Sequence, residues 1–309
     1  MRSVQISACQ FPIERMASFN DFRTRVGWFL EQVPRDSDYV LFPELFTVGL
    51  LTTYPNSERL SSADLTRIDE FTPQYLELFR GVARDRNQFI VAGSHLERHG
   101  DRYFNVAHIF TPDGCDIPHK KTHIFPAESQ WQTAEGDDLE VCELGPAKVG
   151  VATCYEAEIP EVCRILAVGG AEIILCPSFT FSERGFWRVR HCAQARCIEN
   201  QIYFVHCCTI GHPGAPLPDG FGRSSILSPC DTAWPANGIV AEAETNRAMV
   251  VTGKVDIDEL YENRKTGAAT TFRDRIRREP VYRKYDPYRP QRQDAATASV
   301  AGRAAPAHA

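Results

Sequence analysis

The stretch VGVATCYEAEIPEV, residues 149–162, joins a run of small apolar residues to an acidic segment that contains a proline. The apolar run is typical of a buried strand, and Pro160 fits the first turn of a helix closed by the glycine pair 169–170. Cys154 is therefore predicted to lie at a strand end, where open α/β sheets place their sites. There the backbone N–H of Tyr155 would face an oxyanion, and the helix start would favour the thiolate.

The chain has 11 cysteines, so position alone does not separate a nucleophile from a structural cysteine at 154. The spacing contains no CxxC pair, and no histidine pair has zinc-finger spacing. We therefore expect no metal site, and most cysteines should be reduced, buried and apolar in character. Cys163, inside the predicted helix, and Cys176, inside a strand, are expected to be structural.

Strands and helices alternate along the rest of the chain, with hairpins between them. Helical spacing of apolar residues predicts helices at 17–33, about 63–86, 158–170 and 183–200. Strands are predicted at 3–11, 38–44, 88–95, 148–154, 171–179, 201–210, 222–228 and 249–257, with a hairpin over 103–124. This pattern indicates one α/β domain with mixed sheets over residues 1–287, but it does not decide the number of layers. Residues 288–309 are poor in large apolar side chains and are predicted to be a disordered tail.

Composition excludes several classes of function. The net charge of -6, without a basic cluster in the body of the chain, disfavours nucleic-acid binding. No apolar run reaches the roughly 18 residues that a membrane span requires. The N-terminal segment has no long apolar stretch typical of a secretory signal, so a cytoplasmic location is expected.

A thiol nucleophile requires a base, and the sequence offers two kinds. His191 and Cys192 are neighbours in one predicted helix, so they point about 100° apart and make a poor dyad. Nothing local favours His191 as a partner of Cys154. Glu44 ends the run YVLFPE, where a charge costs several kcal/mol unless it is paired or the strand end emerges into solvent.

The hairpin at 103–124 carries two adjacent lysines. Lysines on hairpins are usually solvated, but strand alternation places Lys121 on the face of His119 and His123, and Lys120 on the other. If Lys121 points inward, Lys120 must therefore point outward.

Three ordered blocks, FPE at 42–44, KKTHI at 120–124 and TCYEAEIPE at 153–161, resemble the signature blocks of the nitrilase superfamily, the carbon–nitrogen hydrolases. Residues 125–139 (FPAESQWQTAEGDDL) resemble the loop after the family lysine. Residues 188–205 (RVRHCAQARCIENQIYFV) resemble the helix and strand that follow the nucleophile in amidase-like members. The resemblance covers roughly residues 3 to 280.

This resemblance implies an α-β-β-α sandwich and a catalytic triad of Glu44, Lys121 and Cys154. Glu128 matches a second glutamate that many members place beside the lysine. The implied activity is cleavage of a non-peptide C–N bond in a small amide, through a thioester on Cys154, without a metal or organic cofactor. Lys121 and the backbone N–H of Tyr155 would stabilise the oxyanion.

Substrate contacts are predicted in the segment PSFTFSERGFW, residues 177–187, which follows a strand. We expect Phe179, Thr180 and Trp187 to edge the pocket, although aromatic residues there also serve as ordinary core. Tyr155 resembles amidase-type members, since nitrile-hydrolysing members more often have tryptophan after the cysteine. The acidic residues after Cys154 disfavour a negatively charged substrate, although Arg184 could still reach the pocket.

Other interpretations remain open at this point. A nitrilase or an N-carbamoyl-amide hydrolase would use the same triad, and a thioester would also permit acyl transfer to an amine. A binding or scaffold protein without turnover is the alternative of another class. The resemblance also implies a homodimer or larger homo-oligomer, formed through the helices beside the nucleophile.

Overall fold

The strands of the chain form one continuous mixed sheet that folds into two packed halves. The computed structural model describes residues 2–285, so the predicted tail at 288–309 lies outside the described residues. The strands are β1 Ser3–Pro12, β2 Tyr39–Leu41, β3 Phe89–His99, β4 Arg102–Phe110, β5 Asp116–Lys120, β6 Thr133–Ala134, β7 Val141–Leu144, β8 Ala147–Val151, β9 Ile173–Phe179, β10 Tyr203–Ile210, β11 Ser225–Leu227, β12 Ile239–Glu242 and β13 Met249–Asp256.

Seven α-helices accompany these strands in the described part of the chain. They are α1 Phe19–Gln32, α2 Thr72–Arg86, α3 Pro160–Val168, α4 Glu183–Asn200, α5 Ile257–Thr266, α6 Thr271–Arg277 and α7 Glu279–Tyr285. The chain divides into one unit that ends at Thr271 and a second that begins at Phe272. The fold described below belongs to the first unit. None of the helices in the described residues is long and apolar enough to cross a membrane.

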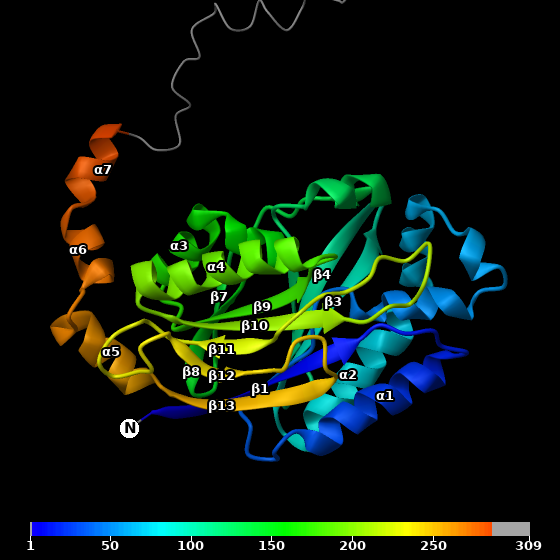
Figure 1. Ribbon diagram of the computed structural model, residues 1–309, viewed down its shortest axis with the longest axis horizontal. Helices are drawn as coiled ribbons and strands as arrows, with labels where there is room; N and C mark the ends of the chain where they lie inside the picture. The colour runs from blue at the N-terminus through cyan, green and yellow to red at the C-terminus, as the bar shows by residue number, and fades with distance from the viewer. Residues whose placement is uncertain (1, 286–309) are drawn as a thin grey trace, which may run out of the picture. The chain divides into compact units, whose positions relative to one another are not determined.

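Strand β1 lies where the two halves meet. The first half runs β5-β4-β3-β2-β1, and the second runs β10-β9-β8-β7. Only two parallel pairs, Phe11 with Thr209 and Pro12 with Ile210, join β1 to β10. Strand β2 pairs in parallel with the middle of β1 on one edge, and β13 pairs antiparallel with most of its length on the opposite edge. Strand β1 therefore joins the two half-sheets, and Figure 1 shows it beside β13.

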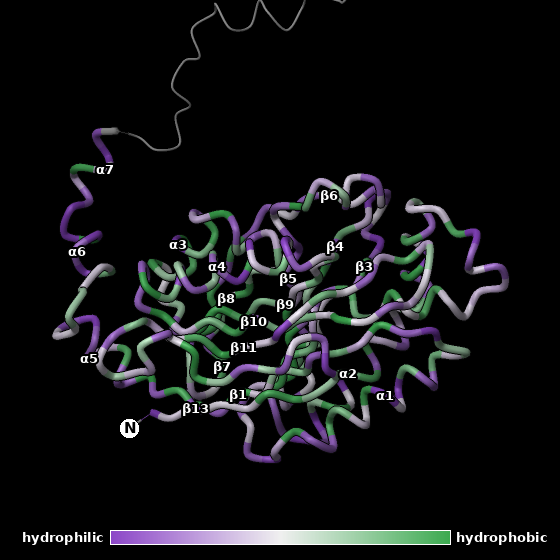
Figure 2. The backbone as a smooth tube through the Cα atoms, in the orientation of Figure 1, coloured by the Kyte–Doolittle hydropathy of each residue, from purple (hydrophilic) through white to green (hydrophobic). Residues whose placement is uncertain are grey.

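The core between the two half-sheets draws apolar side chains from both. It includes Val4, Ile6, Tyr39, Leu41, Val91 and Ile109 from the first half and Val149, Val151, Ile173, Leu175, Tyr203 and Val205 from the second. Figure 2 shows hydrophobic residues concentrated along the strands inside the molecule. Because strands buried on both faces carry continuous apolar runs, these segments were recognisable as strands from sequence.

Helices cover the outer face of each half-sheet. Phe22 and Phe29 of α1 and Phe79 of α2 belong to an apolar cluster with strand residues of the first half. On the second half, Phe186 of α4 stacks on His206 of β10 with a ring-centroid distance of 5.6 Å. The layers therefore follow the order helix, sheet, sheet, helix, and the expected α-β-β-α sandwich is confirmed.

Two predicted elements differ from the structure. The predicted helix at 63–86 is a 3-10 helix, Ser62–Phe71, followed by α2, whose first turn contains Pro73. Proline has no backbone N–H and fits a helix start but not a helix interior, so it marks the break. The predicted second hairpin strand extends too far, since β5 ends at Lys120 and Lys121 begins a loop.

Candidate active site

Cys154 occupies a strained turn directly beyond β8. The 3-10 turn Cys154–Glu158 begins at this residue, whose φ of 48° lies in the left-handed region. A residue other than glycine in that region costs about 1–3 kcal/mol, so the surrounding structure must hold it there. The side chain is buried, and its Sγ lies 3.7 Å from the carbonyl oxygen of Phe179.

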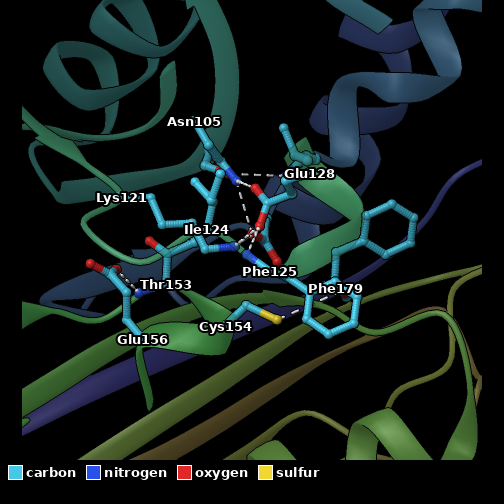
Figure 3. Close-up of polar contacts among 12 residues, drawn as sticks. Asn105, Lys121, Ile124, Phe125, Glu128, Thr153, Cys154, Glu156 and Phe179 are labelled. Carbon is cyan, nitrogen blue, oxygen red and sulfur yellow. Dashed lines mark hydrogen bonds and ion pairs between the residues drawn. The ribbon is translucent and has the colours of Figure 1, made fainter. Parts of the chain in front are cut away.

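Lys121 binds two glutamates from different parts of the chain, Glu44 and Glu128, of which Figure 3 labels Glu128. Its Nζ lies 2.8 Å from Glu44 Oε1 and 2.5 Å from Glu128 Oε2. Glu44 follows β2 after a Phe-Pro pair, and Glu128 lies in the 3-10 helix Pro126–Trp131. All three side chains are buried, with exposed fractions of 1–3 %. The sequence puzzle of Glu44 is thereby resolved, because its charge is paired and does not emerge into solvent.

Neutral hydrogen-bond donors also contact both carboxylates. The Asn105 side-chain amide donates to Glu44 Oε1 and to Glu128 Oε1, at 2.9 Å each. The backbone N–H of Phe179 donates to Glu44 Oε2 at 2.7 Å, and that of Phe125 to Glu128 Oε2 at 2.8 Å. Hydrogen bonds from several elements therefore fix the direction of each carboxylate.

Burial and charge shift the proton affinities of these groups. Burial raises the pKa of Glu44 above its ordinary value, and the Lys121 ammonium only partly offsets this effect. Burial alone would lower the pKa of Lys121, but the carboxylates of Glu128 and Glu44 raise it well above its ordinary value. Burial, followed by the charge of Glu44, raises the pKa of the Cys154 thiol. These shifts favour an ammonium at Lys121 and a neutral thiol at Cys154, and they make the carboxylate of Glu44 more basic than usual.

The neutral thiol differs from the thiolate that the sequence led us to expect. That expectation relied on the electrostatic field of a helix N-terminus. In the structure a five-residue 3-10 turn follows Cys154, and α3 begins only at Pro160. Desolvation and the carboxylate of Glu44 therefore determine the direction in which the pKa of the Cys154 thiol shifts.

One cavity of about 160 Å³ collects these groups. Glu44, Lys121, Glu128 and Cys154 line it, together with Tyr155. Four aromatic side chains, Phe125, Trp131, Phe179 and Phe181, form part of its remaining wall, beside smaller apolar and polar residues. The structure therefore places all four candidate catalytic side chains on one small, largely apolar cavity.

The predicted substrate contacts are only partly brought together. Phe179 and Thr180 line the cavity, but Trp187 does not. On α4 the lining residues are Gly185, Arg188 and Val189, which share one helix face at i, i+3 and i+4. Trp187 lies on another face, is 38 % exposed and stacks on His191.

An ion pair at the cavity wall was not predicted. The carboxylate of Glu158 accepts from Arg188 Nε at 3.3 Å, and both residues line the cavity. Arg184, the arginine considered from sequence, is not a lining residue. Asn105 was also missed, although a lone amide in the apolar strand YFNVAHIF was a usable signal. In the described part of the chain, no group of three or more His, Cys, Asp or Glu residues is arranged to hold a metal ion.

Comparisons with known proteins identify the family of this chain. The carbon-nitrogen hydrolase family model matches residues 5–265. The probable hydrolase YhcX of Bacillus subtilis (strain 168) is 36% identical over 279 residues, covering 89% of this chain and 54% of that protein. The chain thus spans about half the length of YhcX. An (R)-stereoselective amidase of Pseudomonas sp. is 28% identical over 197 residues, covering 61% of this chain and 68% of that enzyme.

Solved structures show the same fold. Saccharomyces cerevisiae Nit3, a member of branch 10 of the nitrilase superfamily, superposes with a TM-score of 0.69 and 22% identity. The match covers 85% of this chain and 93% of Nit3.

Proposed function

The chain belongs to the carbon-nitrogen hydrolase family, and from this premise we propose that it hydrolyses a small non-peptide amide to a carboxylic acid and ammonia or an amine. The observation that carries the proposal is the Glu44–Lys121–Glu128 cluster on the same cavity as the thiol of Cys154. A nucleophile, a base and a fixed positive charge are the groups that acyl transfer through a thioester requires.

The first half-reaction forms the thioester. Glu44 takes the proton of the Cys154 thiol, and the sulfur attacks the amide carbonyl carbon. The Lys121 ammonium and the Tyr155 backbone N–H stabilise the negative charge that develops on oxygen, and each such donor is worth about 3 kcal/mol. The C–N bond then breaks, and the leaving nitrogen takes the proton from Glu44.

The second half-reaction releases the acid. Glu44 takes a proton from water, and the resulting hydroxide attacks the thioester carbon. The C–S bond breaks, and the Cys154 thiolate recovers the proton from Glu44. The raised pKa of Glu44 suits this repeated exchange, because a more basic carboxylate accepts the thiol proton more readily. Glu128 and Asn105 would hold Lys121 and Glu44 in place throughout.

The cavity supports a small, uncharged acyl group as substrate. Its volume of about 160 Å³ and its aromatic walls favour a short aliphatic or aromatic acyl chain. The charge of Arg188 is already paired with Glu158, so the cavity offers no isolated cation for a substrate carboxylate. Tyr155 after the nucleophile resembles amidase-type members, which supports an amide over a nitrile.

Ammonia release from a defined panel tests this proposal. The panel contains propionamide, benzamide, their nitriles and an N-carbamoyl amino acid, each assayed with the wild type and with Cys154→Ala. We expect release from the amides with the wild type only. Release from nitriles or carbamoyl compounds alone would replace the amidase assignment by that reaction on the same triad. No release from any member, with Cys154 also inert to iodoacetamide, would contradict an enzymatic role and favour a binding protein.

A further inference from the structure

The carboxylate of Glu156 lies two residues after the nucleophile, yet it does not line the cavity. It is fully buried and collects four donors. Oε1 accepts from the backbone N–H of Thr122 at 2.8 Å and from its hydroxyl at 2.6 Å. Oε2 accepts from the backbone N–H of Thr153 at 2.6 Å, and His119 Nε2 lies 3.0 Å from the same oxygen.

These donors come from the two segments that carry the reacting groups. Thr122 directly follows Lys121, which continues from β5 in the first half-sheet. Thr153 directly precedes Cys154, which continues from β8 in the second half-sheet. One carboxylate therefore ties the lysine loop to the nucleophile turn across the two halves. Figure 3 shows Glu156 beside Thr153 and Cys154.

The same contacts act on the strained backbone of Cys154. The turn closes through the Glu156 backbone N–H, which donates to the Thr153 carbonyl oxygen at 3.0 Å. The side chain of Glu156 also accepts from the Thr153 N–H. Glu156 therefore binds both the N–H and the carbonyl oxygen of Thr153, the residue that precedes the left-handed Cys154. A left-handed cysteine persists only where neighbouring contacts over-determine it.

We propose that Glu156 is a positioning residue, which holds Cys154 in its left-handed conformation and fixes its distance from Lys121. This inference rests on the proposed function, since it assigns Glu156 a role in the reaction of Cys154. Glu156 touches none of the reacting atoms and acts through Thr153 and Thr122.

The ionised form of Glu156 is essential to this role. Burial alone would raise its pKa, but His119 and Thr122 lower it below the ordinary value, so the side chain is a carboxylate. A carboxylate accepts at both oxygens, whereas glutamine presents one oxygen and one NH₂ donor. In Glu156→Gln, the NH₂ group must face either the Thr122 or the Thr153 N–H, so one of these contacts is lost.

The test measures the reactivity of Cys154 independently of any substrate. Iodoacetamide alkylates the thiolate and releases iodide, and mass spectrometry follows the Cys154 peptide, with the exposed Cys115 and Cys230 as internal references. We expect Glu156→Gln to slow alkylation of Cys154 about tenfold or more and to leave both references unchanged. With the most active panel amide, kcat should fall about 100-fold, as expected for a misplacement near 1 Å, while KM changes less than about threefold.

Glu172→Gln is the matched control. Glu172 is equally buried and accepts from Arg2 and from the Lys148 N–H, but it lies outside the cavity. Its substitution should lower the melting temperature without changing alkylation of Cys154 or kcat. Equal effects of the two variants on Cys154 would overturn the proposal, because they would show a general cost of altering a buried carboxylate.

A second pair of variants decides the matter if Glu156→Gln does not fold. Thr122→Val removes the hydroxyl donor to Glu156, and Thr122→Ser retains it. We expect slower alkylation in the valine variant and recovery in the serine variant; equal rates in both would refute the role. Because alkylation requires no turnover, a failed amide panel with intact alkylation differences would contradict hydrolysis of the panel amides and leave the positioning role standing.

Discussion

The proton affinity of Glu44 governs the proposed reaction at the scale of single residues. Glu44 and Glu128 bind the same lysine, but the two are not equivalent. The backbone N–H of Phe179, whose carbonyl oxygen faces the Cys154 sulfur, donates to Glu44. Glu128 instead accepts from Phe125 in its own loop. The position of Glu44 therefore favours it as the base, and Glu128 as a support for the lysine.

The pH dependence of activity should report the pKa of Glu44. Only the ionised carboxylate can accept the thiol proton, and burial raises its pKa above the ordinary value. We expect kcat/KM to fall as the pH is lowered, with a midpoint above about 4.3, the value of an unperturbed glutamate. Glu44→Gln should lose at least about 100-fold in kcat, and Glu128→Ala should fold with a smaller loss. A fully active Glu128→Ala variant would exclude a role for Glu128 in the reaction.

Residue-scale prediction succeeded where the backbone pattern carried information. The end of a strand singled out Cys154, whereas Glu44 and Lys121 were assigned to the site only through the family resemblance. Lys121 is buried, and Lys120, which the alternation would then turn outward, is half-buried. Strand alternation does not explain the burial of Lys121, since this residue lies beyond the strand. Trp187 could not be excluded from sequence, because the face of α4 that meets the cavity depends on how that helix packs.

The bulge in β3 is the feature that directs Glu44 at the scale of secondary structure. The register with β4 shifts between Val91 and Ser94, and Gly93 between them has a φ of +66°. The Ser94 N–H donates to the carbonyl oxygen of Pro43, next to Glu44. A Cβ on Gly93 would lie 2.0 Å from the same oxygen. Only glycine therefore lets the bulge approach the Glu44 loop.

Gly93→Ala should damage both stability and activity. The positive φ and the overlap with Pro43 predict a loss of about 2 kcal/mol or more in the free energy of unfolding, measured in urea. Activity should fall further than the folded fraction, because Glu44 moves with Pro43. Gly81→Ala, in α2 with nothing within 4 Å of the new Cβ, is the control and should stabilise by about 0.5–1 kcal/mol. Unchanged activity per folded molecule in Gly93→Ala would argue against this coupling.

A buried histidine ties together β3, β4 and β5. His108 lies 2.6 Å from a carboxylate oxygen of Glu97 and 2.8 Å from one of Asp116, and its ring also neighbours Tyr75 and His95. Burial alone would lower the pKa of His108, but Asp116 and Glu97 raise it to about 9. The folded state therefore binds this proton more tightly than the unfolded chain does.

Stability should accordingly fall on the alkaline side. The contribution of His108 is fully present below about pH 6.5, its unfolded pKa, and is lost as the pH rises through the folded value of about 9. We expect His108→Gln to lower the free energy of unfolding at pH 6, since it leaves Glu97 without its charged partner. The difference from the wild type should shrink towards pH 9.5. A difference independent of pH would show that His108 is neutral in the folded state.

The outer helices of the second half-sheet expose several large apolar side chains. Ile165 and Val168 of α3 and Ile198 of α4 are 42–50 % exposed. Large apolar side chains gathered on packed neighbouring helices are typical of an association surface. We therefore predict that the chain forms a homodimer or larger homo-oligomer through α3 and α4.

Light scattering with surface variants checks this prediction. The double variant Ile165→Lys, Ile198→Lys should be monomeric, with its fold intact by circular dichroism. Trp28→Lys, at an equally exposed aromatic residue of α1, should leave the assembly unchanged. A wild type that stays monomeric across micromolar concentrations would contradict the predicted association through α3 and α4.

Whole-molecule architecture was the least accessible from sequence. Continuous apolar runs identified the strands, but a run buried on both faces looks the same in a sandwich of any number of layers. The pairing of β1 with β10 and β13 joins residues about 200 to 250 positions apart, and no local pattern encodes it. The layer order was therefore available only through resemblance.

The pairing of β1 with β13 also has a consequence for folding during synthesis. Ser3 pairs with Asp256, so β1 is synthesised long before its partner strand β13. At about 5–20 residues per second, that interval is roughly 12–50 s. During this interval the backbone N–H and C=O groups of β1 that later pair with β13 have no partner strand, although the nascent chain already contains Cys154. We therefore expect Cys154 to reach its final buried environment only late in synthesis, and β1 to need protection from wrong pairing until β13 has emerged.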